Sequence, residues 1–222
     1  MVLVHGLGVS HRYFRPLADD LAADRAVVAP DLPGFGLTPG PRRPLDVRGL
    51  SRCLADWLRT TGRERSVLVA NSAGCQVVLD LARHSPELLG PCVLVGPTFD
   101  SRSRSVAPQA ARLLAAMTGE APSLVPVLVR DYLACGPARF LRTLRLLLRD
   151  TPEEKAASLV VPAVLMRGSR DALAPEAWLT RLAQPMPDVR VVQVAGVGHA
   201  LNWSAPHEVA RQARALGPPR DP

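Results

Sequence analysis

The chain has 222 residues, of which 47% are hydrophobic and 21% charged, a size and composition that suit one globular domain with a sizeable core. It contains no apolar run of about eighteen residues or more, which excludes a conventional membrane-spanning helix. The formal net charge of +7 comes from arginines spread along the chain, so an arginine-biased surface is favoured over a nucleic-acid interface.

Strand-like apolar runs alternate with helical patterns along most of the chain. The predicted strands are residues 1–4, 25–30, 66–70, 92–95, 161–167 and 189–194. The predicted helices are residues 14–23, 47–61, 74–84, 174–182 and 206–216. Short apolar strands separated by helices predict an α/β fold, with a mostly parallel sheet covered by helices on both faces.

The alternation breaks between the strands at 92–95 and 161–167. Helical patterns fill this region at 107–117, 124–133 and 138–148, with no clear strand among them. A helical block inserted between two sheet strands predicts a lid over the carboxyl ends of the strands, where ligands bind in open α/β sheets. The predicted organisation is therefore residues 1–99 and 160–222 as the two parts of the core, with residues 100–159 as the lid. The alternative is ordinary helices on a longer fold.

The four cysteines indicate the cellular compartment. They form no Cys-x-x-Cys pair, which disfavours a zinc or dithiol site, and Cys75 and Cys92 fall in apolar segments typical of the core. The first residues lack the basic start and cleavage site of a signal peptide. Free thiols and a cytoplasmic location are expected.

A candidate nucleophile stands where an apolar strand stops at a tight turn and a helix begins. The turn reads Ala-Asn-Ser-Ala-Gly, a degenerate form of the G-x-S-x-G elbow, with Ser72 at its centre. A serine hydroxyl is a poor nucleophile at neutral pH and needs a neighbouring base. Taken alone, Ser72 could equally be a helix cap.

Two further residues provide the base and the acid. His199 lies in a glycine-flanked loop after the last predicted strand, and Asp171 lies in a turn after the strand before it. His199 can take the serine proton, and Asp171 can hold its imidazole in the required tautomer. Asp171 could alternatively cap the next helix, with Asp100 as the fallback acid. The other histidines have structural interpretations, and His5 is expected to shape the first loop.

The remaining requirement is an oxyanion site made of backbone N–H groups. Ala73, directly after the nucleophile, supplies one donor, and Leu7 in the first loop supplies the other. The order Ser, Asp, His, with each residue after its own strand, is far more specific than any single member. No metal or organic cofactor is implied.

These motifs resemble the α/β-hydrolase superfamily in its lid-bearing form. The matching segments are residues 5–8, 31–36, 71–74, 168–171 and 198–199. The resemblance implies Ser72 as nucleophile, Asp171 as acid, His199 as base, and Leu7 and Ala73 as oxyanion donors. Family members usually carry two more strands before the first loop, so the first two strands are expected to be missing and residues 25–30 to form an open edge. Whether the native start lies upstream is left open.

The default reaction is hydrolysis of a small, mostly apolar ester or thioester through an acyl-enzyme. Activity is expected to fall on acidification near about pH 6.5. No nucleic-acid partner is expected, and the oligomeric state is left open. Seven apolar lid residues suggest a hydrophobic acyl pocket, although this spacing also suits simple packing: Leu113, Leu114, Met117, Leu124, Val127, Leu128 and Leu133.

Two alternatives remain. Asn71-Ser72 is similar to the elbow of the C–C bond hydrolases that act on ring-cleavage products, and Trp203 matches them too, whereas Ala200 departs from them. Six lid arginines could bind the carboxylate of such a substrate, or could simply be solvated: Arg104, Arg112, Arg130, Arg139, Arg142 and Arg145. The second alternative is a non-catalytic binding protein on the same fold.

Overall fold

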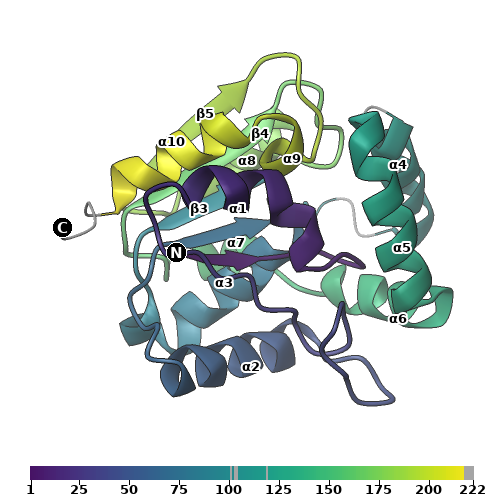
Figure 1. Cartoon of the computed structure of the whole chain (residues 1–222), viewed down its shortest axis with the longest axis horizontal. Helices are drawn as coiled ribbons and strands as arrows, with labels where there is room; N and C mark the ends of the chain where they lie inside the picture. The colour runs from purple at the N-terminus through teal and green to yellow at the C-terminus, as the bar shows by residue number, and fades with distance from the viewer. Residues whose placement is uncertain (101, 103–104, 119, 218–222) are drawn as a thin grey trace.

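The computed structural model describes residues 1–100, 102, 105–118 and 120–217. Five parallel strands form one sheet in the spatial order β1-β2-β3-β4-β5, which is also their order along the chain (Figure 1). They are β1 Val2–Val4, β2 Leu68–Asn71, β3 Cys92–Val95, β4 Ala163–Gly168 and β5 Val189–Val194. The predicted α/β fold with a parallel sheet is confirmed.

Helices cover both faces of this sheet (Figure 1). The helices are α1 Arg15–Leu21 and α10 Pro206–Leu216 on one face, and α2 Val47–Thr60, α3 Ala73–His84 and α8 Glu176–Ala183 on the other. Successive strand residues point to opposite faces. Val2 and Val4 accordingly join the core of α2 and α3, whereas Leu3 joins that of α1. The buried Cys75 and Cys92 belong to the first of these cores, as predicted.

The predicted strand at 25–30 is wrong. This segment touches the sheet through an isolated bridge between Val28 and Val2. Leu3 N donates to Val28 O (2.9 Å) and Val28 N donates to Met1 O (3.0 Å). The ladder stops there because β1 has three residues before the His5 turn, and because Pro30 has no N–H to donate. The segment lies along the outer side of β1.

The region between β3 and β4 is helical, as predicted. It contains α4 Val106–Thr118, α5 Val125–Cys135, α6 Pro137–Leu147 and the short helix α7 Pro152–Ala156, with η4 Pro122–Leu124 before α5. We call residues 100–159 the helical insertion. Figure 1 shows α4, α5 and α6 standing together beyond one end of the sheet. Across the described residues, no helix has the length and apolar character needed to cross a membrane.

Polar and apolar contacts tie the helical insertion to the loops of the core. Ser10 Oγ donates to Asp131 Oδ2 (2.6 Å) and Trp203 Nε1 donates to Ser123 Oγ (3.0 Å). Beside these contacts, Leu124 and Leu128 pack in one buried cluster with Val9, Tyr13 and Ala200. The segment formed by η4 and α5 is thereby held against the segments that follow β1 and β5.

Candidate active site

The turn at Ser72 is a strained elbow between β2 and α3. Ser72 has φ 56° and ψ −123°, a backbone region that non-glycine residues seldom occupy. Two hydrogen bonds to the last carbonyl of β3 hold it there: Ser72 N to Val95 O (2.8 Å) and Asn71 Nδ2 to the same oxygen (3.3 Å). A Cβ at position 74 would lie 2.4 Å from Val4 O, so Gly74 is required where α3 meets β1.

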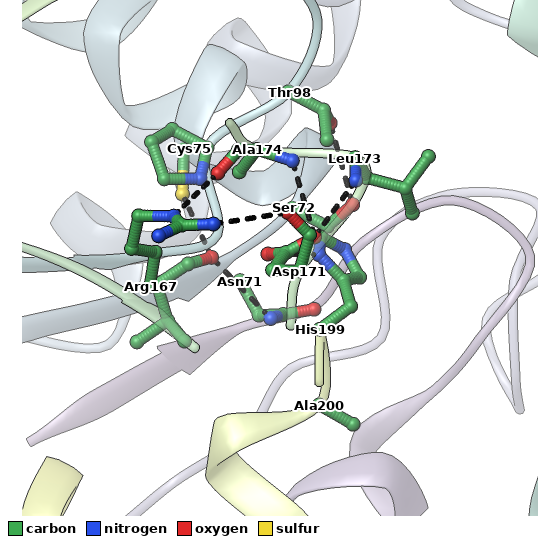
Figure 2. A network of polar contacts seen from close by, with 12 residues as sticks. Asn71, Ser72, Cys75, Thr98, Arg167, Asp171, Leu173, Ala174, His199 and Ala200 are labelled. Carbon is green, nitrogen blue, oxygen red and sulfur yellow. Dashed lines mark hydrogen bonds and ion pairs between the residues drawn. The ribbon is translucent and has the colours of Figure 1, made fainter. Parts of the chain in front are cut away.

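Asp171 and His199 form a buried pair beside this elbow (Figure 2). His199 Nδ1 lies 2.8 Å from Asp171 Oδ2. The other oxygen, Oδ1, accepts from Leu173 N (2.9 Å) and Ala174 N (3.1 Å). Asp171 therefore pairs with His199 through one oxygen and closes the turn before α8 through the other. The alternative in which it caps the next helix is wrong, because α8 begins at Glu176 with Pro175 as its N-cap and no side-chain cap. A Cβ on Gly96 would lie 2.8 Å from His199 Cε1, so the loop after β3 packs closely against the imidazole.

The surroundings of the pair shift the pKa values of its two members in opposite directions. Burial disfavours the charge on Asp171, but His199 and the two N–H groups outweigh it, so the pKa of Asp171 is lowered from its ordinary value. Burial also disfavours a charged His199, but Asp171 and then Glu120 outweigh it, so the pKa of His199 is raised above 6.5. The carboxylate therefore stays ionised and the imidazole takes up a proton more readily than an ordinary histidine.

Ser72 and His199 line one cavity but are not hydrogen-bonded to each other. Ser72 Oγ lies 3.3 Å from Thr98 Oγ1. His199 Nε2 is buried without a hydrogen-bond partner among the described residues. Catalytic hydrogen bonds are often long or absent until substrate binds, so this arrangement is compatible with proton transfer between the two groups.

The two predicted oxyanion donors lie at the same end of the sheet. Ala73 is the first residue of α3, where an N–H has no acceptor within its own helix. Leu7 follows the tight approach of Gly6 to the nucleophile, since a Cβ on Gly6 would lie 2.9 Å from Ser72 Cβ. We find no acceptor for the N–H of Leu7 within the described part of the chain.

The cavity at Ser72 has a volume of about 50 Å³ and mostly apolar walls. The insertion contributes Leu113, Leu124, Leu128 and Tyr132 to these walls. Three of the seven predicted apolar residues therefore line it. Val127 packs against the buried cluster that contains Leu124 and Leu128. The side chains of Leu114 and Met117 lie outside the described residues. Leu133 is 77% exposed, so its predicted place in the pocket is wrong.

The alternative in which arginines of the helical insertion bind a substrate carboxylate is not supported. No arginine or lysine occurs among the described residues that line the cavity. Arg139 Nη2 instead donates to Pro41 O (2.7 Å), and three more arginines are exposed: Arg130, Arg142 and Arg145. Arg112 is half-buried away from the cavity wall, and Arg104 lies outside the described residues.

Two residues near the pair were missed by sequence reasoning. Arg167, at the end of β4, donates from Nε to Ala174 O (2.8 Å) and from Nη2 to Asp171 O (3.3 Å), which fixes the loop that carries Asp171 (Figure 2). Its signal was a charged residue inside an apolar strand. Glu120 Oε1 accepts from His199 N (2.8 Å) and Ala200 N (3.0 Å). Glu120 had no sequence signal, because its place depends on how the insertion folds.

The remaining candidates have structural partners. His5 Nδ1 donates to Gly6 O (2.8 Å) and its Nε2 accepts from Leu32 N (2.9 Å), so this buried imidazole shapes the first loop, as expected. Asp100, the fallback acid, pairs with Arg181. No group of three or more metal-ligating side chains occurs among the described residues.

Comparison with known proteins identifies the family. The model of the "Alpha/beta hydrolase family" matches residues 1–212. The chain is 29% identical to the pimeloyl-[acyl-carrier protein] methyl ester esterase of Aromatoleum aromaticum, over 95% of this chain and 94% of that protein. It is 28% identical to the biotin biosynthesis bifunctional protein BioHC of Cellvibrio japonicus, over 94% of this chain but 45% of that protein's length.

A solved structure supports the same fold. A thermophilic esterase from Thermogutta terrifontis superposes with a TM-score of 0.81. The superposition covers 96% of this chain and 87% of the esterase, at 19% sequence identity.

Proposed function

The chain belongs to the alpha/beta hydrolase family, and on this premise we propose that it is a serine hydrolase acting on small, mostly apolar esters or thioesters. The observation that carries the proposal is the convergence of Ser72 with the buried Asp171–His199 pair at one apolar cavity. The full-length match to an esterase supports the ester class. No residue of the proposed reaction requires a metal or an organic cofactor.

The proposed reaction proceeds through an acyl-enzyme. His199 Nε2 takes the Ser72 hydroxyl proton while Oγ bonds to the acyl carbon, and the N–H groups of Leu7 and Ala73 receive the oxyanion. Collapse breaks the bond to the leaving group, which takes the proton from His199. Water then attacks the acyl carbon, again giving its proton to His199, and the acid departs as Ser72 recovers its hydrogen.

We further propose that the helical insertion acts as the lid. The cavity of about 50 Å³ holds a few water molecules at most, far less than the several hundred Å³ of an ordinary ligand pocket. Leu113, Leu124 and Leu128 are among the residues on its insertion side. Entry of an ester therefore requires these helices to move away from the loops after β1 and β5.

Covalent labelling with a fluorophosphonate probe tests the nucleophile. Folded protein should be labelled on the peptide that contains Ser72, and should hydrolyse activated short-chain esters. Labelling should be lost in urea, because the probe needs the assembled site. Folded protein that neither takes the label nor cleaves any member of an ester and thioester panel would instead support the binding-protein alternative.

The pH dependence of kcat/KM should show an acid limb above pH 6.5. Only unprotonated His199 can accept the serine proton, and Asp171 and Glu120 raise its pKa. Activity is thus full above the raised pKa and falls as pH drops through it, which places the limb above the value expected from sequence alone. Steady-state rates on a neutral ester between about pH 5 and 9 measure this. A flat profile down to pH 5 would contradict His199 as the base.

A further inference from the structure

Glu120 brings a carboxylate from the helical insertion to the catalytic cavity. It lies between α4 and η4 and lines the same cavity as Ser72 and His199. One oxygen, Oε1, is fully used, because it accepts hydrogen bonds from both His199 N and Ala200 N. The backbone of the proposed base therefore rests on a side chain of the insertion.

The second oxygen of Glu120 has no hydrogen-bond partner in the part of the chain that the structure describes. Oε2 is buried and accepts no hydrogen bond from any described residue. Buried polar atoms in folded proteins are nearly always hydrogen-bonded, so an unpaired one calls for an explanation such as a functional role. A substrate in the adjoining cavity is a source of the missing donor.

The charge around this oxygen is negative. No lysine or arginine lines the cavity among the described residues, and the ionisable groups near Glu120 are His199, Asp171, Tyr13 and Tyr132. Burial outweighs the two N–H groups on Oε1 and the neighbouring His199, so the pKa of Glu120 is raised above its ordinary value. Where His199 is neutral, a substrate carboxylate would therefore meet like charge and no cation.

Building on the proposed serine hydrolase, we propose that Glu120 is a specificity-determining residue. Its free oxygen accepts a hydrogen bond from a hydroxyl, amide or ammonium group of the substrate, and its charge excludes substrates with a carboxylate near the scissile bond. The substrate class is then a neutral or cationic ester with a hydrogen-bond donor. This also separates the chain from C–C hydrolases whose substrates carry a carboxylate.

Matched esters of different charge test the proposal. One series is aryl butyrates with a methyl, hydroxymethyl, trimethylammonium or carboxylate group at the meta position. The other places the charge on the acyl side: ethyl butyrate, its terminal trimethylammonium derivative and monoethyl succinate. Rates are normalised to alkaline hydrolysis and compared as kcat/KM at about pH 8, an alkaline pH chosen because burial raises the pKa of Glu120.

The wild type should cleave the carboxylate ester about tenfold more slowly than the neutral ester in at least one series, and the hydroxymethyl ester faster than the methyl ester. Glu120→Gln should bring kcat/KM for the carboxylate ester to within about threefold of that for the neutral ester. The substitution removes the charge but keeps an oxygen for the two N–H groups. It should also move the acid limb to lower pH, since it removes a negative charge beside His199. A purely structural role would not cause these changes.

Two further variants serve as controls. Glu120→Asp keeps the charge and should keep the discrimination against the carboxylate ester. Glu176→Gln removes an exposed charge on α8, outside the cavity, and should leave every ratio unchanged. Urea unfolding midpoints check that each variant is folded.

The outcomes separate the two proposals. Neutral esters cleaved with no charge discrimination, or with discrimination that survives in folded Glu120→Gln, would overturn the role of Glu120 and leave the serine hydrolase intact. If Glu120→Gln did not fold, the same ratio in folded Glu120→Ala would decide. A folded wild type that cleaves no ester would overturn both.

Discussion

Ser72→Ala should lower kcat for ester hydrolysis by a factor of about 10⁴ to 10⁶, with unfolding stability nearly unchanged. The alanine keeps the Cβ that packs against Gly6 and the backbone bond to Val95 O, so only the hydroxyl is lost. The strained φ of 56° is equally costly for serine and alanine. Stopped assays on an activated ester and a urea titration measure the two effects.

Ser66→Ala is the matched control, because Ser66 lies just before the amino end of β2, the same strand whose carboxyl end carries Ser72. Its kcat should stay within about twofold of wild type, because this half-buried serine lies at the opposite end of the strand from the site. Equal activity of Ser72→Ala and wild type would remove Ser72 from the mechanism and favour the non-catalytic alternative.

Asp171→Asn should lower kcat by a factor of about 10⁴ without unfolding the chain. Leu173 N and Ala174 N both donate to Oδ1, so the amide oxygen of the asparagine will take that position. The amide NH₂ then faces His199 Nδ1, which becomes an acceptor. The proton moves to Nε2, and the imidazole can no longer accept the proton of Ser72.

Asp100→Asn distinguishes the two acids that the sequence offered. Asp100 pairs with Arg181 and lies after β3, so its loss should leave kcat within about threefold of wild type. A severe loss in Asp100→Asn together with an active Asp171→Asn would reverse the assignment. Steady-state rates on one ester for both variants are sufficient.

Parallel strands are what made the core of the site predictable. Apolar runs revealed β2, β4 and β5, and the carboxyl ends of neighbouring parallel strands meet at one edge of a sheet. Ser72, Asp171 and His199 each lie in the turn or loop that follows one of these strands. Their proximity therefore follows from topology, and did not require the packing of side chains to be known.

The features that could not be predicted correctly from the sequence depend on contacts between distant segments. Residues 25–30 have a strand-like composition, yet pairing needs a partner with free backbone groups, and the three residues of β1 offer room for a single bridge. Leu133 fits a helical apolar pattern but points to solvent. Glu120 reaches His199 N across 79 positions of sequence, and no local pattern encodes that contact.

The helical insertion leaves the sheet after β3 and returns at β4, and these two strands are direct neighbours, with Cys92 opposite Ala163. Because these strands are parallel, the insertion starts at the carboxyl end of β3 and the chain returns at the amino end of β4, one strand length away, and the entropy of closing such a loop grows only slowly with its length. The sheet and the elbow can thus tolerate insertions of different size or sequence at this point. Substrate range can then diverge among relatives, or be redesigned by exchanging this segment as a cassette, without rebuilding the nucleophile.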